Sequence, residues 1–226
     1  VVDPGDPLPV TERLEALGLR LETILITHHH ADHQGGVAAL VERWQAEVYG
    51  PGNESITGCN RPLLGGETIS VLGQQVSVLA VPGHTLGHLA YYVPGALFCG
   101  DTLFGAGCGR LFEGTPAQMS ASLDKIAALP DDTKIYCAHE YTEANLRFAL
   151  AVEPQNPALL DRVQRVAALR AAEWPSVPST LNEEKASNPF LRCAQIKVIQ
   201  AAEEHGAVDH SPVAVFSAIR QWRNGF

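Results

Sequence analysis

The sequence predicts an α/β fold over residues 1–142, followed by a small helical domain over residues 143–226. Three observations lead to this division. Near the start, a strand pattern, a helix pattern and a second strand pattern follow one another, which is typical of α/β layers. Between residues 48 and 100, short apolar segments alternate with glycine and proline, as in hairpins of short strands. After Thr142 the strand patterns stop and helix patterns take over.

Turn residues and apolar spacing divide the chain into predicted elements. Val1-Val2 resembles the end of a buried strand, and Asp3-Pro4-Gly5-Asp6 is typical of a turn. The predicted strands lie at 21–27, within 71–81, at 89–93 and at 134–138. The predicted helices lie at 12–17, 37–41, 117–129, 145–152, 157–174 and 212–223, and prolines at 154, 175, 178 and 189 separate the last of them.

Composition and charge limit the classes of function. Of the 226 residues, 46% are hydrophobic, and no apolar run approaches the ~20 residues that a membrane span needs. The net charge of −9 argues against a general nucleic-acid-binding surface. The five cysteines form no CxxC pair, which favours reduced thiols. We therefore expect a cytoplasmic monomer that acts on a small molecule, with no nucleic-acid or membrane partner.

The run Thr27-His28-His29-His30-Ala31-Asp32-His33 predicts a metal site. Chance would produce H-x-H-x-D-H roughly once in two thousand such chains. At the end of a strand, residues two apart point to the same side, so His28 and His30 can share one metal. Where the chain turns towards a helix, Asp32 and His33 can reach a second position nearby.

Three further candidate ligands each follow a short strand pattern. They are His84 after Val-Pro-Gly, Asp101 after Phe-Cys-Gly, and His139 after Tyr-Cys-Ala. A metal usually takes three or four protein ligands, so the first cluster needs such partners. An aspartate in this position can bridge two cations with its two oxygens. The residues therefore predict a two-metal hydrolase site in which Asp32 and Asp101 act as both metal ligands and catalytic groups.

The remaining histidines have simpler interpretations. His205 and His210 are expected to be surface or hydrogen-bonding residues. His88 is expected to form hydrogen bonds, with bracing of a metal ligand as the alternative. His29 lies between two candidate ligands on the opposite strand face, which favours a packing role.

Four phrases together resemble the metallo-β-lactamase superfamily: THHHADHQGG, VPGHTLGH, CGDTLFGAGCGRLFEGT and YCAHEYT. Within it the chain is most similar to the glyoxalase II (hydroxyacylglutathione hydrolase) family. The phrases VEPQNPAL, VPSTLNEEKASNPFLR and AIRQWRNGF extend this likeness into the helical part. The resemblance implies an αββα sandwich with a helical domain. It also implies one metal on His28, His30 and His84, another on Asp32, His33 and His139, and Asp101 as the bridge.

The resemblance also implies a reaction. It is the hydrolysis of the thioester S-D-lactoylglutathione to glutathione and D-lactate, the last step of methylglyoxal detoxification. Two divalent ions per chain would supply a bridging hydroxide near neutral pH, and these ions can be zinc, iron or manganese. A thiolate leaves without a strong acid, because a free thiol has a pKa of ~8.5. Cys108 is the rival candidate for a covalent nucleophile.

The resemblance assigns glutathione contacts to Arg110, Tyr141, Arg220 and Arg223. Arg220 and Arg223 are three residues apart, which places both on one face of the last helix. Phe112 stands where relatives often carry a tyrosine whose hydroxyl contacts glutathione. Relatives also carry further strands before VVDPGD. We therefore expect either a sequence that begins inside a longer chain or a sandwich without that edge.

Other functions remain open at this stage. Another hydrolase of the superfamily, such as a lactonase, would use the same ligands. A persulfide dioxygenase would use a similar histidine motif but a single iron, so the number of bound metals separates it. A binding module with a decayed site is the non-enzymatic alternative, and the presence of every candidate ligand argues against it.

Overall fold

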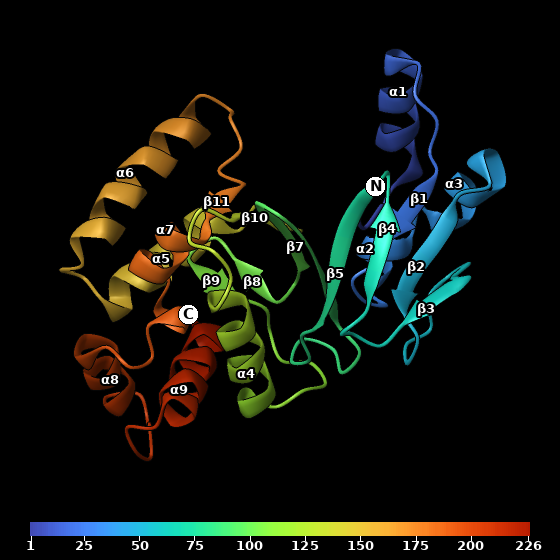
Figure 1. Cartoon of the computed structure of the whole chain (residues 1–226). Helices are drawn as coiled ribbons and strands as arrows, with labels where there is room; N and C mark the ends of the chain where they lie inside the picture. Colours follow the sequence, from blue (N-terminus) through green and yellow to red (C-terminus); the bar gives the residue numbers. More distant parts are fainter. The chain divides into compact units, whose positions relative to one another are not determined.

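A computed structural model describes all residues 1–226 and divides them into two compact units (Figure 1). Unit 1 comprises Val1–Ala80 and Gly87–Val93, and unit 2 comprises Val81–Leu86 and Pro94–Phe226. Both units mix helices with short strands, which agrees with the predicted α/β class. No helix combines the length and the apolar character that crossing a membrane requires.

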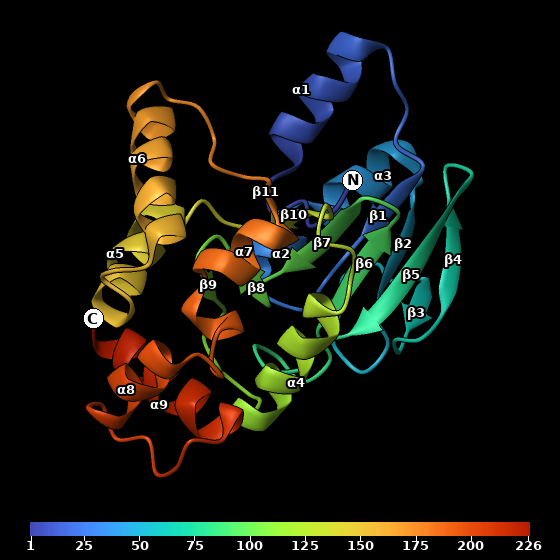
Figure 2. The same cartoon turned by 60° about the vertical axis from the view of Figure 1, so that its left-hand side comes forward.

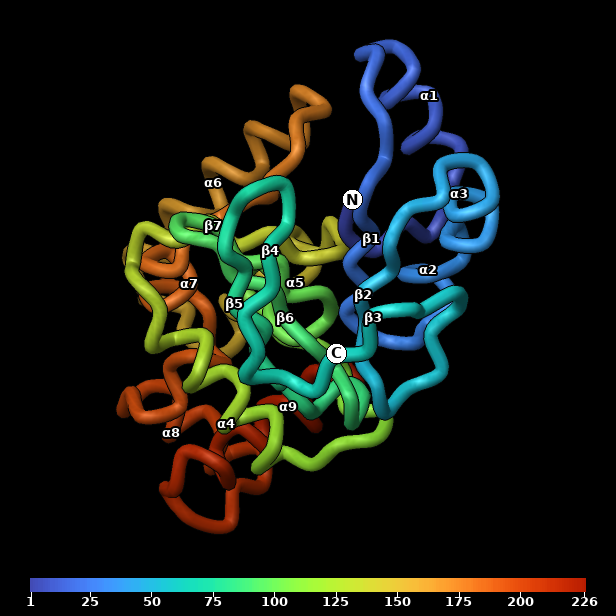
Figure 3. Tube along the Cα trace, turned by 45° about the vertical axis from the view of Figure 1, so that its right-hand side comes forward, coloured from blue at the N-terminus to red at the C-terminus, as the bar shows by residue number.

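Unit 1 contains two sets of paired strands. The first is parallel, with β2 between β1 and β3, and Val2 adds a bridge to Leu25. The second is antiparallel, with β5 between β4 and β6, and its long β4–β5 hairpin is evident in Figure 3. The strands are β1 (Thr23–Leu25), β2 (Glu47–Pro51), β3 (Arg61–Leu63), β4 (Thr68–Val71), β5 (Gln74–Ala80) and β6 (Leu89–Val93).

Helices α1 (Pro7–Leu17) and α3 (Val37–Trp44) cover an apolar core on the parallel sheet. Ile24 and Val48 from the strands pack there with Val37 and Leu40 from α3. Helix α1 begins five residues before the predicted start at Glu12, because Asp6 caps Leu8 N and Pro7 occupies the first turn. The predicted strand at 21–27 is shortened to β1, because the chain leaves the ladder before the histidine motif.

Unit 2 is built around β7 (Ala96–Gly100) and β10 (Lys134–Cys137), which are parallel neighbours, and a short strand β11 (Ser179–Thr180) pairs with β10. A second hairpin joins β8 (Leu103–Phe104) to β9 (Gly107–Cys108). The prediction that strands stop after Thr142 was therefore wrong for β11. Its two residues are too few for a period-two pattern to be visible.

Helices make up the rest of unit 2, and α4, α8 and α9 lie side by side in Figure 2. Helix α4 begins with a capping box in which Thr115 and Gln118 exchange hydrogen bonds. The predicted helices at 117–129, 145–152, 157–174 and 212–223 are all present within a few residues. The full set is α4 (Pro116–Ala127), α5 (Thr142–Val152), α6 (Pro157–Ala171), α7 (Leu181–Ser187), α8 (Ile196–Glu203), α9 (Pro212–Gly225) and the 3₁₀ helix η1 (Pro189–Leu191), of which α7, α8 and η1 were not predicted.

In unit 1, α2 (Ala31–Gln34) and the turn after Val2 pass so closely that only glycine fits between them. A Cβ on Gly5 would lie 2.1 Å from the carbonyl oxygen of Asp32. We expect Gly5→Ala to lower the free energy of unfolding by about 1–3 kcal/mol, because backbone must move to admit the methyl group. Urea denaturation measures this. The control is Gly225→Ala, whose added Cβ meets nothing within 4 Å. Equal midpoints for the two variants would contradict the close approach.

Candidate active site

In unit 1, the segment between β1 and α2 gathers four of the predicted metal ligands. His28 is fully buried, and its Nε2 lies 3.0 Å from Nδ1 of His30. The ring of His33 lies 4.0 Å from that of His28, measured between centroids. Asp32 is more exposed, with Oδ2 at 3.7 Å from Nε2 of His33. Each of these four residues belongs to a group of side chains that could hold a metal ion, and imidazole and carboxylate are common metal ligands.

Asp3 holds this segment in place. Its Oδ1 accepts the backbone N–H of Thr27 at 2.8 Å, and its Oδ2 accepts the Thr27 hydroxyl at 2.8 Å. The same Oδ2 lies 3.0 Å from Nδ1 of His33. A carboxylate accepts a hydrogen bond from Nδ1–H, which leaves Nε2 with the lone pair that can bind a metal. The sequence analysis assigned Asp3 only to a turn and therefore missed this role.

Glu54 is a second supporting residue that the sequence analysis missed. One oxygen accepts the backbone N–H of His29 at 2.7 Å, and the other accepts that of Gly87 at 2.8 Å. Gly87 directly precedes His88, which is fully buried and stacks on His28 with centroids 4.7 Å apart. His88 therefore packs behind a candidate ligand, as its alternative interpretation anticipated.

In unit 2, Asp101 and two histidines form the other candidate group. Because β7 and β10 are parallel neighbours, the residues that follow them meet at one edge of the sheet. Oδ1 of Asp101 lies 3.6 Å from Nε2 of His139, and Oδ2 lies 3.3 Å from Nε2 of His84. The two oxygens of one carboxylate thus face two different imidazoles.

The loop before α4 fixes the orientation of His84. Its Nδ1 lies 2.8 Å from the backbone oxygen of Arg110. A carbonyl oxygen can only accept, so Nδ1 carries the proton and Nε2 keeps the lone pair that a metal binds. The approach needs glycine at 109, because a Cβ there would lie 1.8 Å from the backbone oxygen of Asp101.

A basic pocket of about 230 Å³ lies beside the C-terminal end of α9 in unit 2. Arg220 donates to the backbone oxygen of Cys108 at 2.9 Å and to Oδ1 of Asn224 at 3.1 Å. Arg223 donates to Oδ1 of Asn145 at 3.4 Å. Burial, and then the charges of Arg220 and Arg147, lower the pKa of Arg223 from its ordinary value. The lining consists of Phe104, Cys108, Arg110, Tyr141, Asn145, Arg220, Arg223 and Asn224.

The other predicted substrate-binding residues touch the candidate ligands of unit 2. Tyr141 is half exposed and stacks on His139, with centroids 4.9 Å apart. Phe112 meets His84 edge-on at 5.2 Å. The guanidinium of Arg110 lies 5.5 Å from the ring centre of Phe112. Two aromatic rings therefore lie beside the candidate ligands His84 and His139, and the Arg110 cation lies over one of these rings.

Cys108 is unsuited to covalent catalysis. All five are free, and Cys108 lies in the basic pocket. Burial raises the pKa of the Cys108 thiol, an effect that the neighbouring Arg220 only partly offsets. A thiol that stays protonated is a weak nucleophile. The alternative in which Cys108 attacks the substrate is therefore disfavoured.

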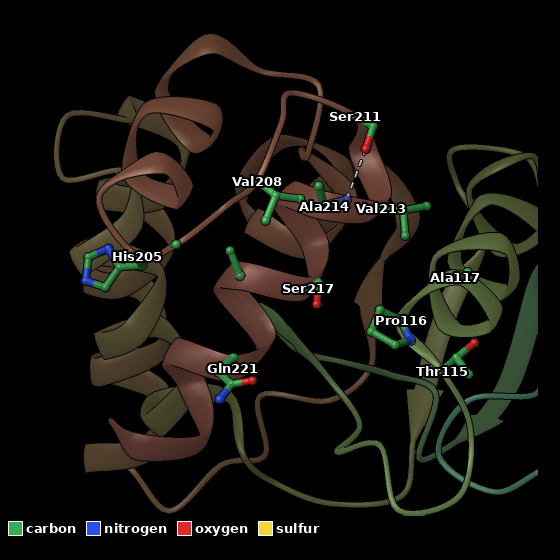
Figure 4. Close-up of a pocket in the computed structure, with 12 residues that line it drawn as sticks. Thr115, Pro116, Ala117, His205, Val208, Ser211, Val213, Ala214, Ser217 and Gln221 are labelled. Carbon is green, nitrogen blue, oxygen red and sulfur yellow. Dashed lines mark hydrogen bonds between the residues drawn. The ribbon is translucent and has the colours of Figure 1, made fainter.

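A hollow of about 600 Å³ between the start of α4 and the α8–α9 loop has a different character (Figure 4). Its lining consists mostly of short apolar and hydroxyl side chains, among them Ser211, whose hydroxyl caps α9 at Ala214 N. His205 is exposed, lies near Ala201 O and stacks on Trp222, so it has the surface role that the sequence predicted. His210 is likewise exposed and pairs with Glu203. The hollow holds no group of metal ligands.

Comparison with known proteins identifies the family. The pattern of the metallo-beta-lactamase superfamily matches residues 1–139, and that of the hydroxyacylglutathione hydrolase C-terminus matches residues 140–226. A hydroxyacylglutathione hydrolase of Dechloromonas aromatica (strain RCB) is 71% identical, covering 100% of this chain and 91% of the relative. The chain belongs to the hydroxyacylglutathione hydrolase family. A second relative with the same name, from Methylobacillus flagellatus, is 54% identical over 100% of this chain and 90% of its own length.

Solved structures confirm the metallo-β-lactamase fold. The crystal structure of ETHE1 from Myxococcus xanthus has a TM-score of 0.62 at 28% identity, covering 81% of this chain and 68% of the other. The crystal structure of TTHA1623 in a di-iron-bound form has a TM-score of 0.59 at 29% identity, covering 84% and 87%. The family and fold expected from the four sequence phrases are therefore confirmed.

The burial of the thiols predicts a selective pattern of alkylation. Desolvation raises the pKa of Cys137 to about 11 and that of Cys193 to about 12, so both stay protonated at pH 8. Cys59 is partly exposed. We expect iodoacetamide at pH 8 to modify Cys59 and to leave Cys108, Cys137 and Cys193 intact, as read by peptide mass mapping. Labelling of Cys108 as fast as Cys59 would restore the covalent alternative.

Proposed function

We propose that this chain hydrolyses S-D-lactoylglutathione to D-lactate and glutathione, the reaction expected of a hydroxyacylglutathione hydrolase. The observation that carries the proposal is the basic pocket of unit 2. Arg220 and Arg223 line it together with Tyr141, which stacks on the candidate ligand His139. A site that combines metal ligands with paired cations suits a substrate that joins a hydrolysable thioester to carboxylates.

We propose the ligand assignment that the family pattern implies. His28, His30 and His84 would hold one divalent ion, and Asp32, His33 and His139 would hold the other. Asp101 would contribute a ligand to both. The donor set of imidazole nitrogens and carboxylate oxygens without thiolate fits zinc, iron or manganese.

The side chains suit this assignment because the hydrogen bonds fix their protonation. His33 and His84 each direct Nδ1 to an acceptor, Asp3 and Arg110 O respectively, which presents Nε2 for binding. The two oxygens of Asp101 face His84 and His139 separately. When bound, the ions would lower the pKa of a water molecule and polarise the thioester carbonyl.

The protein's own contribution is to hold the thioester. Arg220 and Arg223 bind a carboxylate of the glutathione part, and the ring of Tyr141 packs against its peptide backbone. Arg110 adds a third cation to the lining of the basic pocket. Phe112 offers a ring without a hydroxyl, so it supports Arg110 and His84 by packing rather than by hydrogen bonding to the substrate. A thiolate leaving group needs no strong acid, so no further acid is assigned.

We also propose that the two parts of the chain have different roles, metal binding in the first and substrate binding in the second. Residues 1–142 carry every candidate metal ligand, and residues 143–226 carry both arginines of α9. The net charge of −9 and the free cysteines support action on a small molecule in a reducing, cytoplasmic compartment, without a nucleic-acid partner. We propose that the enzyme acts as a monomer, because every group assigned above comes from one chain.

Metal analysis combined with a thioester assay tests the proposal. We expect the purified protein to bind two metals per chain and to hydrolyse S-D-lactoylglutathione.

We expect Asp101→Ala to abolish turnover and to lower the metal content, because both ions would lose the ligand that they share. The matched control is Asp132→Ala, an exposed aspartate before β10. Hydrolysis of lactones but not of the thioester would favour a lactonase, and one bound iron per chain would favour a dioxygenase.

Removing the arginines of α9 tests the glutathione site. We expect Arg220→Ala with Arg223→Ala to raise KM for S-D-lactoylglutathione and to change kcat little. Each charge-assisted hydrogen bond contributes ~1.5–3 kcal/mol, so the increase in KM should exceed about tenfold. The control is Arg13→Ala with Arg20→Ala, which removes the same charge from exposed positions in unit 1. An unchanged KM in the first variant would contradict the assignment.

A further inference from the structure

The β8–β9 hairpin of unit 2 makes its turn in a buried place. The turn residues are Gly105 and Ala106, and Ala106 is fully buried at a φ of +55°, which is uncommon for a residue with a side chain. The backbone N–H and C=O groups of such a turn have no water to bind. Each of them needs a partner from elsewhere in the protein, or it costs about 1–3 kcal/mol.

Three side chains from the helical part supply these partners. Glu184 on α7 accepts the N–H of Ala106 at 2.9 Å. Asn188 donates through Nδ2 to the backbone oxygen of Phe104 at 3.2 Å and to that of Gly107 at 2.9 Å. Asn145 on α5 donates to the backbone oxygen of Gly105 at 3.0 Å. Side chains therefore hold the turn on both sides. Glu184 and Asn188 lie more than seventy residues from the turn in the sequence.

A buried charged network fixes two of these side chains. Oε2 of Glu184 also accepts Nδ2 of Asn188 at 3.0 Å, and Oε1 accepts Arg162 at 2.5 Å. Arg162 donates further to the hydroxyl of Ser187 at 2.9 Å. All four residues are almost completely buried. An ion pair in such a place adds little net stability over apolar residues of the same size, so its presence calls for another role.

That role lies in the basic pocket at the other end of the hairpin. Strand β9 ends at Cys108, whose backbone oxygen accepts the guanidinium of Arg220 at 2.9 Å. The same guanidinium lies 5.3 Å from the ring centre of Phe190. Phe190 is tied to the network, because its N–H donates to Oδ1 of Asn188 at 3.1 Å. The segment from Glu184 to Phe190 thus fixes Arg220 from two sides, by hydrogen bonds through the hairpin and by the aromatic face.

We infer that Glu184 and Asn188 are positioning residues for the substrate carboxylate. They hold the β8–β9 hairpin so that Cys108 O directs Arg220 into the pocket. This inference rests on the proposed function of that pocket. It explains why the phrase NEEKASNPF, which supplies no metal ligand and does not line the pocket, belongs with the glutathione site.

Two double variants separate positioning from bulk stability. In Glu184→Gln with Arg162→Leu, the amide oxygen still accepts Ala106 N–H. In Glu184→Leu with Arg162→Leu, that acceptor is lost. Both variants remove the buried ion pair, so they differ mainly in the hydrogen bonds that the side chain at position 184 accepts from the hairpin amide of Ala106 and from Asn188. The surface control is Asn182→Ala, an exposed residue on the same helix α7.

Two readouts report on the pocket. The first is the split between KM and kcat for S-D-lactoylglutathione. The second is the Kd of S-methylglutathione, an inert thioether, measured by calorimetry on the metal-loaded enzyme. We expect Glu184→Leu with Arg162→Leu to raise KM and Kd about tenfold, with kcat and metal content unchanged. We expect the KM and Kd of Glu184→Gln with Arg162→Leu, and those of Asn182→Ala, to stay within about twofold of the parent values.

Equal KM and Kd in the two double variants would overturn the inference. A parent enzyme that binds S-methylglutathione without hydrolysing the thioester would refute the proposed function while leaving the inference testable by Kd. A parent that binds no S-methylglutathione would overturn both the inference and the proposed function.

If the variant Glu184→Leu with Arg162→Leu fails to fold, amide hydrogen exchange in the parent enzyme tests the inference instead. The amide of Ala106 should then exchange slowly and slow further with S-methylglutathione, and exchange as fast as that of the exposed loop residue Val208 would refute the inference.

Discussion

A hydrogen-bond acceptor for the Nδ1–H group is the interaction on which the candidate metal ligands His33 and His84 depend. Buried polar rings are stable only when hydrogen-bonded, and a ring binds metal through one nitrogen only if the other holds the proton. Asp3 serves His33 in unit 1, and Arg110 O serves His84 in unit 2. These acceptors lie on loops distant in sequence from the rings. The loops must therefore pass close to the ligand segments, and glycine at positions 5 and 109 makes that approach possible.

The sequence pattern indicated the candidate ligands but not the residues that support them. The candidate ligands share a visible pattern, because each follows a short apolar strand and is a histidine or an aspartate. Asp3 and Glu54 lack such a pattern. One lies in a segment that has turn chemistry, and the other lies among glycines and polar residues of a loop. Each acts across more than twenty residues of sequence, on Thr27 and His29. Only the folded chain reveals such pairs, since local spacing carries no information about them.

The helical part shows the same limit in a different form. Long helices such as α6 were predicted from their spacing, whereas β11, α7 and η1 were too short for a periodic signal. The phrase LNEEKAS has the composition of an exposed helix. In the structure Glu184 is completely buried, whereas its neighbour Glu183 remains partly accessible. Burial of Glu184 is possible because Arg162, Asn188 and a hairpin amide meet it, and those partners come from three separate segments.

The partners of the arginines explain how an acidic chain can bind an acidic substrate. Arg162 and Arg192 pair with the buried carboxylates of Glu184 and Glu153, which cancel their charge and give them structural roles. Arg220 and Arg223 are held instead by neutral acceptors, a backbone carbonyl and two asparagine side chains, and by aromatic faces. Neutral partners fix the geometry of a guanidinium without cancelling its charge. The lowered pKa of Arg223, caused by burial and then by neighbouring cations, is the sign of that uncompensated charge. A substrate carboxylate would supply the compensation, so the pocket favours an anion even though the protein carries a net charge of −9.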